Sequence, residues 1–303
     1  MLEKTQFQEK MITLLPNIDL RLNEPMSKHT SFRIGGPVEV MAFPKTAEEL
    51  ADVLKVSALL DRKIAILGAG TNILAPDEGL DGLVICLKDS LDGMKQLDES
   101  RIWVAAGVTM CRAAVFAAGL GLSGLEFAHG IPGTVGGGVY MNAGAYGGEI
   151  CQVCERVDVM DMQGNMNTYS AEQMEFSYRH SRLEDEGGIV LGAVFRLTAK
   201  PEEEIRAQMA DLMNRRRTSQ PLDMPSAGST FKRPVGGYAA ALIDQAGLKG
   251  YSKGNAGVSA KHAGFVVNLG GATAREVKDL MRDVSDKVFE NSGIRLEPEV
   301  RIW

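Results

Sequence analysis

The sequence predicts an α+β protein built from two parts, of which the second is smaller. A length of 303 residues is enough for two domains. The turn Gly68-Ala69-Gly70 follows a predicted strand, yet only about ten residues separate Asn72 from the next strand, Leu83–Leu87, too few for the helix of a βαβ unit. Position 73 is Ile instead of the third glycine of a dinucleotide-binding motif. A parallel Rossmann sheet is therefore excluded, and the two strands are expected to be joined by a loop.

The first part of the chain shows alternating strand patterns and two helical patterns. Thr46 and Glu49 have the spacing of a capping box before a helix with Leu50, Val53, Leu54 and Ala58 on one face. Val108 to Ala118 predicts a second helix, ended by Gly119. The remaining expected elements are a helix and extended lead-in over 1–30, strands over Thr30–Ile34, Val38–Phe43, Lys63–Leu67 and Arg101–Ala105, a hairpin of 153–162 with 165–169 around Gln163-Gly164, and a strand over Ile189–Ala199.

The second part begins near Lys200-Pro201, where Pro201 and Glu202–Glu204 are typical of a helix start. Thr273 and Glu276 predict another capping box, before a helix with Val277, Leu280, Met281, Val284 and Val288 on one face. The other elements expected here are a helix over 236–247 and strands over 262–269 and 294–303. We expect a lead-in over residues 1–30 and domains over 31–200 and 201–303.

Composition and charge restrict the possible functions. A hydrophobic content of 45% and a charged content of 24% are typical of a soluble globular protein. The net charge of −6 argues against nucleic acid as a partner. No secretion signal and no 18-residue apolar run are found, so a cytoplasmic protein without a membrane partner is expected. Cys151 and Cys154 have the spacing of half a zinc site or a redox pair, but no second pair follows, so two thiols at a strand start are favoured and no metal is predicted.

The glycine-dense stretch Gly119–Glu149 holds 11 of the 34 glycines. Glycine lets a backbone approach a ligand closely, and the N–H groups near Gly133 and Gly136–Gly138 are expected to form a phosphate cradle. A cluster of structural turns is the alternative interpretation. Gly68-Ala69-Gly70-Thr71-Asn72 is a second expected anion-binding turn. Two such turns in one domain suit a ligand with a pyrophosphate.

Seven segments, found in the same order along nearly the whole chain, resemble the UDP-N-acetylenolpyruvoylglucosamine reductase family. They are HTSFRIGGP (29–37), LGAGTN (67–72), SGLEFAHGIPGTVGGGVYMNAGAYGGE (123–149), SYRHS (177–181), AGSTFKRP (227–234), GNAGVSAKHAGFVVN (254–268) and LEPEVR (296–301). The first three are shared by many flavoproteins of the vanillyl-alcohol-oxidase type, and the last four are more specific to the reductase.

The resemblance implies a two-part FAD-binding domain of the PCMH type followed by a smaller substrate-binding domain. It implies FAD as cofactor, NADPH as hydride donor and a nucleotide-sugar substrate, with a role in peptidoglycan synthesis and therefore in cell shape and division. A monomer or weak oligomer is expected.

The resemblance also implies site residues. Ser229 is the expected proton donor, and Arg179 and Glu299 flank the substrate carboxylate and its enol-like intermediate. An arginine can bind a carboxylate through two parallel hydrogen bonds, whereas a glutamate can donate a hydrogen bond only when protonated. The expected substrate-binding residues are Tyr178, Lys232 and Arg233. The expected FAD-binding residues are Gly35, Gly68, Ala69, Gly70, Thr71, Asn72, Gly130, Ile131, Pro132, Gly133, Thr134, Gly136, Gly137, Ala143 and Ile189.

Several alternatives stay open at the level of sequence. Glu297 competes with Glu299, Arg215–Arg217 are weaker anion candidates, and His129 is more often a structural histidine. No inserted loop with a lid tyrosine is found between Arg179 and Ser229, so the chain resembles the shorter form of the family. Another flavin oxidoreductase, acting on a 2-hydroxy acid or an aldehyde, would need the glycine turns without these three residues. A nucleotide-sugar binding protein without redox chemistry would take up no flavin.

Overall fold

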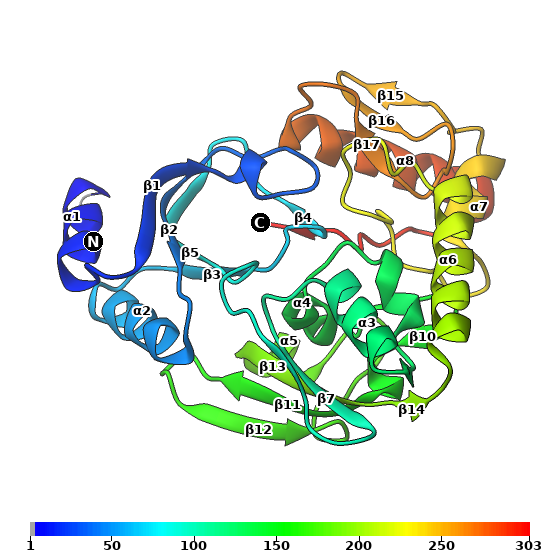
Figure 1. The fold of residues 1–303 in the computed structure, drawn as a ribbon. Coiled ribbons are helices and arrows are strands. Elements are labelled where there is room, and N and C mark those ends of the chain that lie inside the picture. Colours follow the sequence, from blue (N-terminus) through cyan, green and yellow to red (C-terminus); the bar gives the residue numbers. More distant parts are fainter. Residues whose placement is uncertain (1–3) are drawn as a thin grey trace. The chain divides into compact units, whose positions relative to one another are not determined.

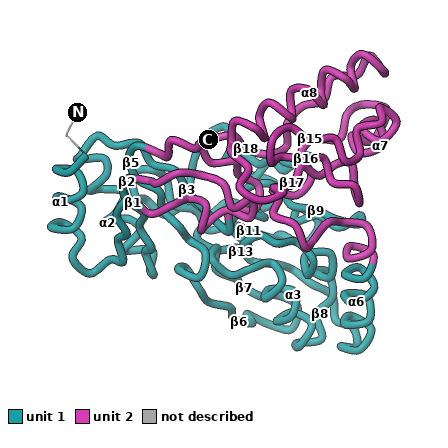
Figure 2. Tube along the Cα trace, turned by 90° about the horizontal axis from the view of Figure 1, so that it is seen from above, with its two compact units in different colours: residues 1–23, 39–69, 81–214 teal, residues 24–38, 70–80, 215–303 magenta. Residues whose placement is uncertain are grey.

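The computed structural model describes residues 4–303, so the first three residues of the expected lead-in lie outside the described residues. The chain divides into two compact units (Figure 2). Unit 1 consists of residues 1–23, 39–69 and 81–214, and unit 2 of residues 24–38, 70–80 and 215–303. Two short segments of the N-terminal half therefore belong to the same unit as the C-terminal region. The domain ranges expected from the sequence stay a prediction, because compact units need not coincide with ligand-binding domains.

Unit 1 contains a four-stranded sheet, a five-stranded sheet, two short two-stranded sheets and the helices that pack on the larger sheets (Figure 1). The four-stranded sheet has the order β1-β2-β5-β3, with β3 and β5 parallel. Its elements are α1 (Lys4–Leu14), β1 (Asp19–Pro25), β2 (Pro37–Phe43), α2 (Ala47–Leu59), β3 (Ile64–Leu67) and β5 (Leu80–Cys86). No helix joins β3 to β5, as the sequence predicted. The helices α1 and α2 cover this sheet through buried side chains such as Phe7, Leu50 and Leu54.

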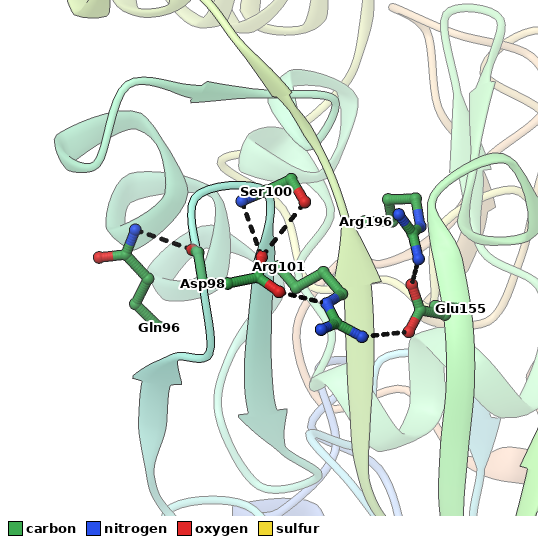
Figure 3. A network of polar contacts seen from close by, with 6 residues as sticks. All are labelled: Gln96, Asp98, Ser100, Arg101, Glu155 and Arg196. Carbon is green, nitrogen blue, oxygen red and sulfur yellow. Dashed lines mark hydrogen bonds and ion pairs between the residues drawn. The ribbon is translucent and has the colours of Figure 1, made fainter.

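The five-stranded sheet of unit 1 has the order β12-β11-β13-β7-β6 and is antiparallel throughout. Its strands are β6 (Met94–Gln96), β7 (Arg101–Ala105), β11 (Cys154–Met160), β12 (Met166–Ser170) and β13 (Ile189–Arg196). The predicted hairpin is confirmed, because β11 pairs with β12 and Gly164 has a φ of 87°. Figure 3 shows how Arg101 of β7 and Arg196 of β13 both contact Glu155 of β11 at one end of the sheet.

Helices α3 (Met110–Gly119) and α4 (Val135–Tyr140) pack on the five-stranded sheet through alanine and valine side chains. Gly119 is the last residue of α3, and the glycine with the left-handed backbone is Gly121, at a φ of 69°. The small elements of unit 1 are β8 (Leu122–Ser123), η2 (Glu126–Gly130), β9 (Gly144–Ala145), β10 (Gly148–Glu149), η3 (Ile150–Gln152), α5 (Arg182–Glu186) and β14 (Thr198–Ala199).

The helix α6 (Glu202–Ser219) starts after Pro201 as predicted. In unit 2, helix α8 (Ala274–Ser292) buries the predicted face, and the capping box of Thr273 and Glu276 is present. An antiparallel three-stranded sheet, β15 (Ser252–Lys253), β16 (Ala256–Val258) and β17 (Val266–Asn268), shares its core with α8. The other elements are η1 (Met26–Lys28), β4 (Ile73–Leu74), α7 (Ala239–Gln245) and β18 (Arg301–Ile302), which is parallel to β4.

Four predicted elements of unit 2 are wrong or too long, and one of them is the strand expected over 262–269, of which only β17 forms. Thr30–Ile34 is a loop instead of a strand, because the Thr30 hydroxyl bonds to the backbone of Ile34 and competes with strand pairing. The C-terminal strand is only β18, since Pro298 lacks an N–H and its neighbours bond irregularly to residues 230–232. The expected helix over 236–247 begins only at Ala239, after Gly236 with a φ of 81°.

Candidate functional site

The turn Gly68–Asn72 joins β3 to β4 and carries unused backbone donors. The N–H groups of Ala69, Gly70 and Thr71 meet no acceptor within the part of the chain that the structure describes. Gly70 has a φ of 61°, and an added Cβ would lie 2.0 Å from the carbonyl oxygen of His29. A glycine is therefore required here, and the free N–H groups are suited to an anionic ligand.

The loop Gly130–Gly138 uses its backbone donors internally. Gly136 donates to the Ala106 carbonyl at 2.9 Å, and Gly137 and Gly138 donate to the hydroxyl and carbonyl of Thr134. The expectation that the N–H groups of Gly136–Gly138 form a phosphate cradle is therefore wrong. These glycines serve close packing, since a Cβ at Gly136 would lie 2.9 Å from the Ala106 Cβ, and one at Gly138 would lie 2.8 Å from the Met110 Sδ.

Gly68, the first residue of the Gly68–Asn72 turn, lies against the second glycine loop within unit 1. A Cβ on Gly68 would lie 2.6 Å from the Thr134 Oγ1. Thr134 is buried and is the N-cap of α4, where it accepts from Gly137, while Gly137 itself has an open side. Two segments expected to hold one ligand are thus brought together at Gly68 and Thr134. Backbone N–H groups without an acceptor, such as those of Ala69–Thr71, are suited to a pyrophosphate such as that of FAD.

The other expected FAD-binding residues have mixed environments. Pro132 is exposed, whereas Gly130, Ile131, Gly133 and Ala143 are partly buried. Ile189 is buried in the core at the start of β13. Gly35 belongs to unit 2, where an added Cβ would lie 2.6 Å from the Ala75 Cβ. Gly35 therefore allows close packing inside its own unit.

Arg179 lies in a tight turn of unit 1. Ser177 and His180 exchange both backbone hydrogen bonds, so Tyr178 and Arg179 are the two central residues. Arg179 has a φ of 57°, a conformation that glycine usually adopts at this turn position. Its Nη2 donates to the Gly144 carbonyl at 3.3 Å, and its guanidinium lies 5.0 Å from the centre of the Tyr178 ring. Arg179 is thereby held against the end of the glycine-dense stretch.

The segments that carry Ser229, Glu299 and Asn72 are connected through hydrogen bonds in unit 2. The Thr230 carbonyl accepts from the Glu299 N–H at 2.8 Å, and the Asn72 Nδ2 donates to the Glu299 carbonyl at 3.1 Å. Asn72 also accepts from the Arg301 N–H at 2.9 Å, next to the pairing of β4 with β18. Three segments that are far apart in the sequence and that the resemblance singled out thus meet in one unit.

The side chains in this part of unit 2 differ in exposure. Ser229 is exposed, and its hydroxyl forms no hydrogen bond with the residues that the structure describes. Thr230 is buried, and its hydroxyl accepts from the Val266 N–H at 2.9 Å. Glu299 is partly buried. The Ser229 hydroxyl is therefore available to a ligand, on a backbone that is fixed by its neighbour.

The structure distinguishes the two candidate glutamates by their surroundings. Glu297 is strongly exposed, and its carboxylate pairs with Lys232 at 3.9 Å. Glu299 lies between Thr230 and Asn72, which favours it as the site residue. Lys232 and Arg233 follow on an exposed segment, with the Arg233 guanidinium 4.0 Å from the centre of the Tyr238 ring.

The remaining candidates receive less support. The Nδ1 of His129 is buried without a partner among the described residues. Burial raises the pKa of the Cys154 thiol to about 12, which makes it a poor nucleophile or metal ligand at neutral pH. Among residues 4–303, no group of three or more His, Cys, Asp or Glu side chains could hold a metal ion. No helix within that range is both long and apolar enough to cross a membrane.

Two residues that the sequence did not single out are prominent in this geometry. Asn142 holds the backbone of the Arg179 turn, and Thr230 joins the segments of Ser229 and Glu299. The signal for Asn142 was available, since asparagine is enriched at left-handed backbone positions and this residue stands among glycines and alanines. Thr230 gave no such signal, because its partners are distant in the sequence.

Comparison with known proteins first defines the class. A family model described as an FAD binding domain matches residues 38–170, and a model described as the C-terminal domain of UDP-N-acetylenolpyruvoylglucosamine reductase matches residues 220–303. The α+β class, with an FAD-binding domain followed by a smaller C-terminal domain, is therefore confirmed.

Similarity to whole proteins then shows the family. The UDP-N-acetylenolpyruvoylglucosamine reductase of Agathobacter rectalis is 44% identical over 98% of both chains, and that of Caldanaerobacter subterraneus subsp. tengcongensis is 45% identical over 97% of both. The crystal structure of MurB from Thermus caldophilus covers 95% of this chain and 99% of its own, with a TM-score of 0.80 and 37% identity. The chain belongs to the UDP-N-acetylenolpyruvoylglucosamine reductase family.

Proposed function

We propose that the protein reduces the enolpyruvyl ether of UDP-N-acetylglucosamine to UDP-N-acetylmuramate, a precursor of peptidoglycan, with FAD as cofactor and NADPH as hydride donor. Two findings support this proposal. The chain resembles named reductases over nearly its whole length. The hydrogen bond between the Glu299 N–H and the Thr230 carbonyl, at 2.8 Å, places two expected catalytic segments next to each other. This contact is the observation that carries the proposal beyond a generic flavoprotein.

FAD is proposed to bind along the two adjacent glycine turns. Bound FAD would supply the hydride chemistry, accepting a hydride from NADPH and passing it to C3 of the enolpyruvyl group. The free N–H groups of Ala69, Gly70 and Thr71 would donate to the pyrophosphate. Gly137, whose added Cβ would meet nothing closer than the Thr134 hydroxyl at 3.5 Å, leaves room for the cofactor to approach. We also propose the FAD-binding role of Gly35, Ile131, Ala143 and Ile189, whose environments differ as described above.

Ser229 is proposed to donate the proton that completes the reaction at C2. When a hydride reaches C3, negative charge develops at C2 and spreads into the carboxylate, so a positioned acid is needed there. A serine hydroxyl is a weak acid, and a backbone held in place by Thr230 on one side allows its proton to be aimed. The addition of one hydride and one proton across the double bond balances the reduction.

Arg179 and Glu299 are proposed to stabilise the charge that develops. A guanidinium keeps its charge and matches a carboxylate through two parallel hydrogen bonds, which suits Arg179 to the enolpyruvyl carboxylate. Glu299, when protonated, can donate a hydrogen bond to the same charge. Tyr178 is proposed to contact the substrate beside Arg179, and Lys232 and Arg233 to meet the pyrophosphate of UDP.

The domain ranges, the cellular location and the oligomeric state are also proposals. We propose an FAD-binding domain over 31–200 and a substrate domain over 201–303. We further propose that the protein acts in the cytoplasm as a monomer or weak oligomer, with NADPH as its hydride donor.

Stopped-flow absorbance of Ser229→Ala tests this function. Reduction of the flavin by NADPH should stay near the wild-type rate, since Ser229 has no role in it. Reoxidation by the enolpyruvyl substrate should fall by more than the ~10²–10⁴-fold usual for loss of one general acid, because the intermediate would lose its proposed proton donor and have no way to go on to product. Ser252→Ala, an exposed serine of β15, is the matched control and should leave both rates unchanged. Equal slowing of both half-reactions would show that Ser229 is structural.

A further inference from the structure

Asn142 is a buried polar residue that the proposed reaction does not use directly. It belongs to the glycine-dense stretch, just after α4, and only 1% of it is exposed. Its backbone has a φ of 41°, in the left-handed region. Asparagine is among the few residues that adopt this conformation readily. The position thus combines an unusual backbone with a polar side chain in the interior of unit 1.

Each polar atom of the Asn142 side chain has a partner. The Nδ2 donates to the Ser177 carbonyl at 3.0 Å and to the Glu149 Oε2 at 3.2 Å, while the Oδ1 accepts from the Cys151 N–H at 3.0 Å. Both amide protons are therefore used. The partners fix the orientation of the amide, because the opposite orientation would place the Oδ1 against a carbonyl and a carboxylate.

These bonds reach the turn that carries Arg179. Ser177 is the first residue of the turn, and it pairs with His180 on the other side of Arg179. The next residue, Ser181, is buried and donates from its hydroxyl to the Tyr140 carbonyl at 2.8 Å. Arg179 itself donates to Gly144. The segment 140–144 therefore holds the turn at both ends and contacts the guanidinium between them.

The backbone of Arg179 needs such support. A non-glycine residue with positive φ is less stable than in a right-handed conformation, so an isolated turn of this sequence would relax. Bonds from outside the turn oppose that relaxation. The Asn142 bond to Ser177 is a side-chain bond, and a substitution can remove it without changing the turn itself.

We propose that Asn142 is a positioning residue, which sets the place of the Arg179 guanidinium for the carboxylate of the enolpyruvyl substrate. This inference rests on the proposed function of the protein. A displacement of about 1 Å at a reacting centre can cost ~10²-fold in rate. Loss of the Asn142 side chain should therefore slow the step in which the carboxylate is bound and charge develops, and spare the step in which NADPH reduces the flavin.

The experiment uses the FAD-loaded protein and two variants. Asn142→Gly keeps a residue that accepts positive φ and removes all three side-chain bonds. Asn142→Asp keeps the size and the acceptor for Cys151, but an ionised carboxylate cannot donate to Ser177 and repels Glu149. Asn23→Gly is the matched control, because Asn23 also has a positive φ, at 50°, and lies on the exposed strand β1.

Stopped-flow absorbance separates the two half-reactions. We expect both Asn142 variants to slow flavin reoxidation by the enolpyruvyl substrate ~10–100-fold, with flavin reduction by NADPH within about twofold of wild type. Asn23→Gly should change neither rate. The effect of Asn142→Gly should be largely lost when Arg179 is already replaced by Ala, because the two residues act through one contact.

Two results would overturn the proposal. One is an Asn142→Gly or Asn142→Asp protein with normal reoxidation, and the other is equal slowing of both half-reactions together with additive effects in the double variant. If Asn142→Gly does not fold, Asn142→Asp decides by the same criteria. The variant Arg179→Ala distinguishes failure of the Asn142 proposal from failure of the proposed function. Normal reoxidation in Arg179→Ala would refute the role of Arg179, whereas slow reoxidation there with normal rates in the Asn142 variants would refute the role of Asn142 alone.

Discussion

Asp77 caps the longest helix of unit 2 from a distant part of the chain, and its removal should destabilise the protein. Its carboxylate accepts from the N–H groups of Ala274, at 2.7 Å, and Arg275, at 3.1 Å, which are the first two residues of α8. The capping box of Thr273 and Glu276 uses the other two N–H groups of that helix end. All four donors that lack a partner within the helix are therefore satisfied.

The magnitude follows from the two bonds and the charge. Loss of a helix-capping acceptor costs ~0.5–2 kcal/mol, and a negative charge at a helix N-terminus adds ~0.3–1 kcal/mol. Water can replace part of this interaction because Asp77 is exposed. We expect the free energy of unfolding to fall by ~2 kcal/mol in Asp77→Ala. Asp77→Asn keeps one acceptor oxygen without the charge, so about half of that loss is expected.

Urea unfolding followed by far-ultraviolet circular dichroism measures this difference. FAD concentration and salt must be held constant, since a bound ligand raises apparent stability and salt weakens the helix dipole interaction. Asp81→Ala is the matched control, because Asp81 is an exposed carboxylate in β5. A loss in Asp77→Ala below ~0.5 kcal/mol, the usual range for surface substitutions, or an equal loss in Asp81→Ala would refute the capping argument.

Two further predictions concern unit 1. Gly136→Ala would bring a Cβ to 2.9 Å from that of Ala106 and should lower the free energy of unfolding by ~1–3 kcal/mol. Gly137→Ala is the control and should be tolerated, because its Cβ would meet only the Thr134 hydroxyl at 3.5 Å. Thermal unfolding compares the two variants, and equal melting temperatures would contradict the packing role of Gly136. Hydrogen bonds from the Ser100 N–H and from Arg101 lower the pKa of Asp98 from 3.8 to about 2 (Figure 3). Because the folded pKa is the lower one, this stabilisation is complete above about pH 4 and is lost as the pH falls toward 2. The free energy of unfolding should therefore fall less steeply over that pH range in Asp98→Asn than in the wild type. An equal slope in the two proteins would count against the hydrogen bonds to Asp98.

The local features of the fold were predictable from the sequence. The helical face of α8, the capping box of Thr273 and Glu276, the hairpin at Gly164 and the helix start after Pro201 all depend on residues within a few positions of each other. Interactions over such short separations are similar in any fold that contains the segment, so their patterns can be recognised directly. The family motifs likewise indicated which turns and side chains to consider.

The tertiary structure decided which donor meets which acceptor. The sequence suggested that Gly136–Gly138 offer their N–H groups to a phosphate, but Ala106 and Thr134 accept them, and the free donors are those of Ala69–Thr71. The hydrogen bonds from Asn142 to Ser177, from Val266 to Thr230 and from Ala274 to Asp77 span 35, 36 and 197 residues. Such bonds form only when packing of the apolar core brings the segments together, because a polar pair alone contributes too little to fix their positions. The sequence thus determined the local elements and the kind of chemistry, and the packed fold determined which residues hold the reactive groups in place.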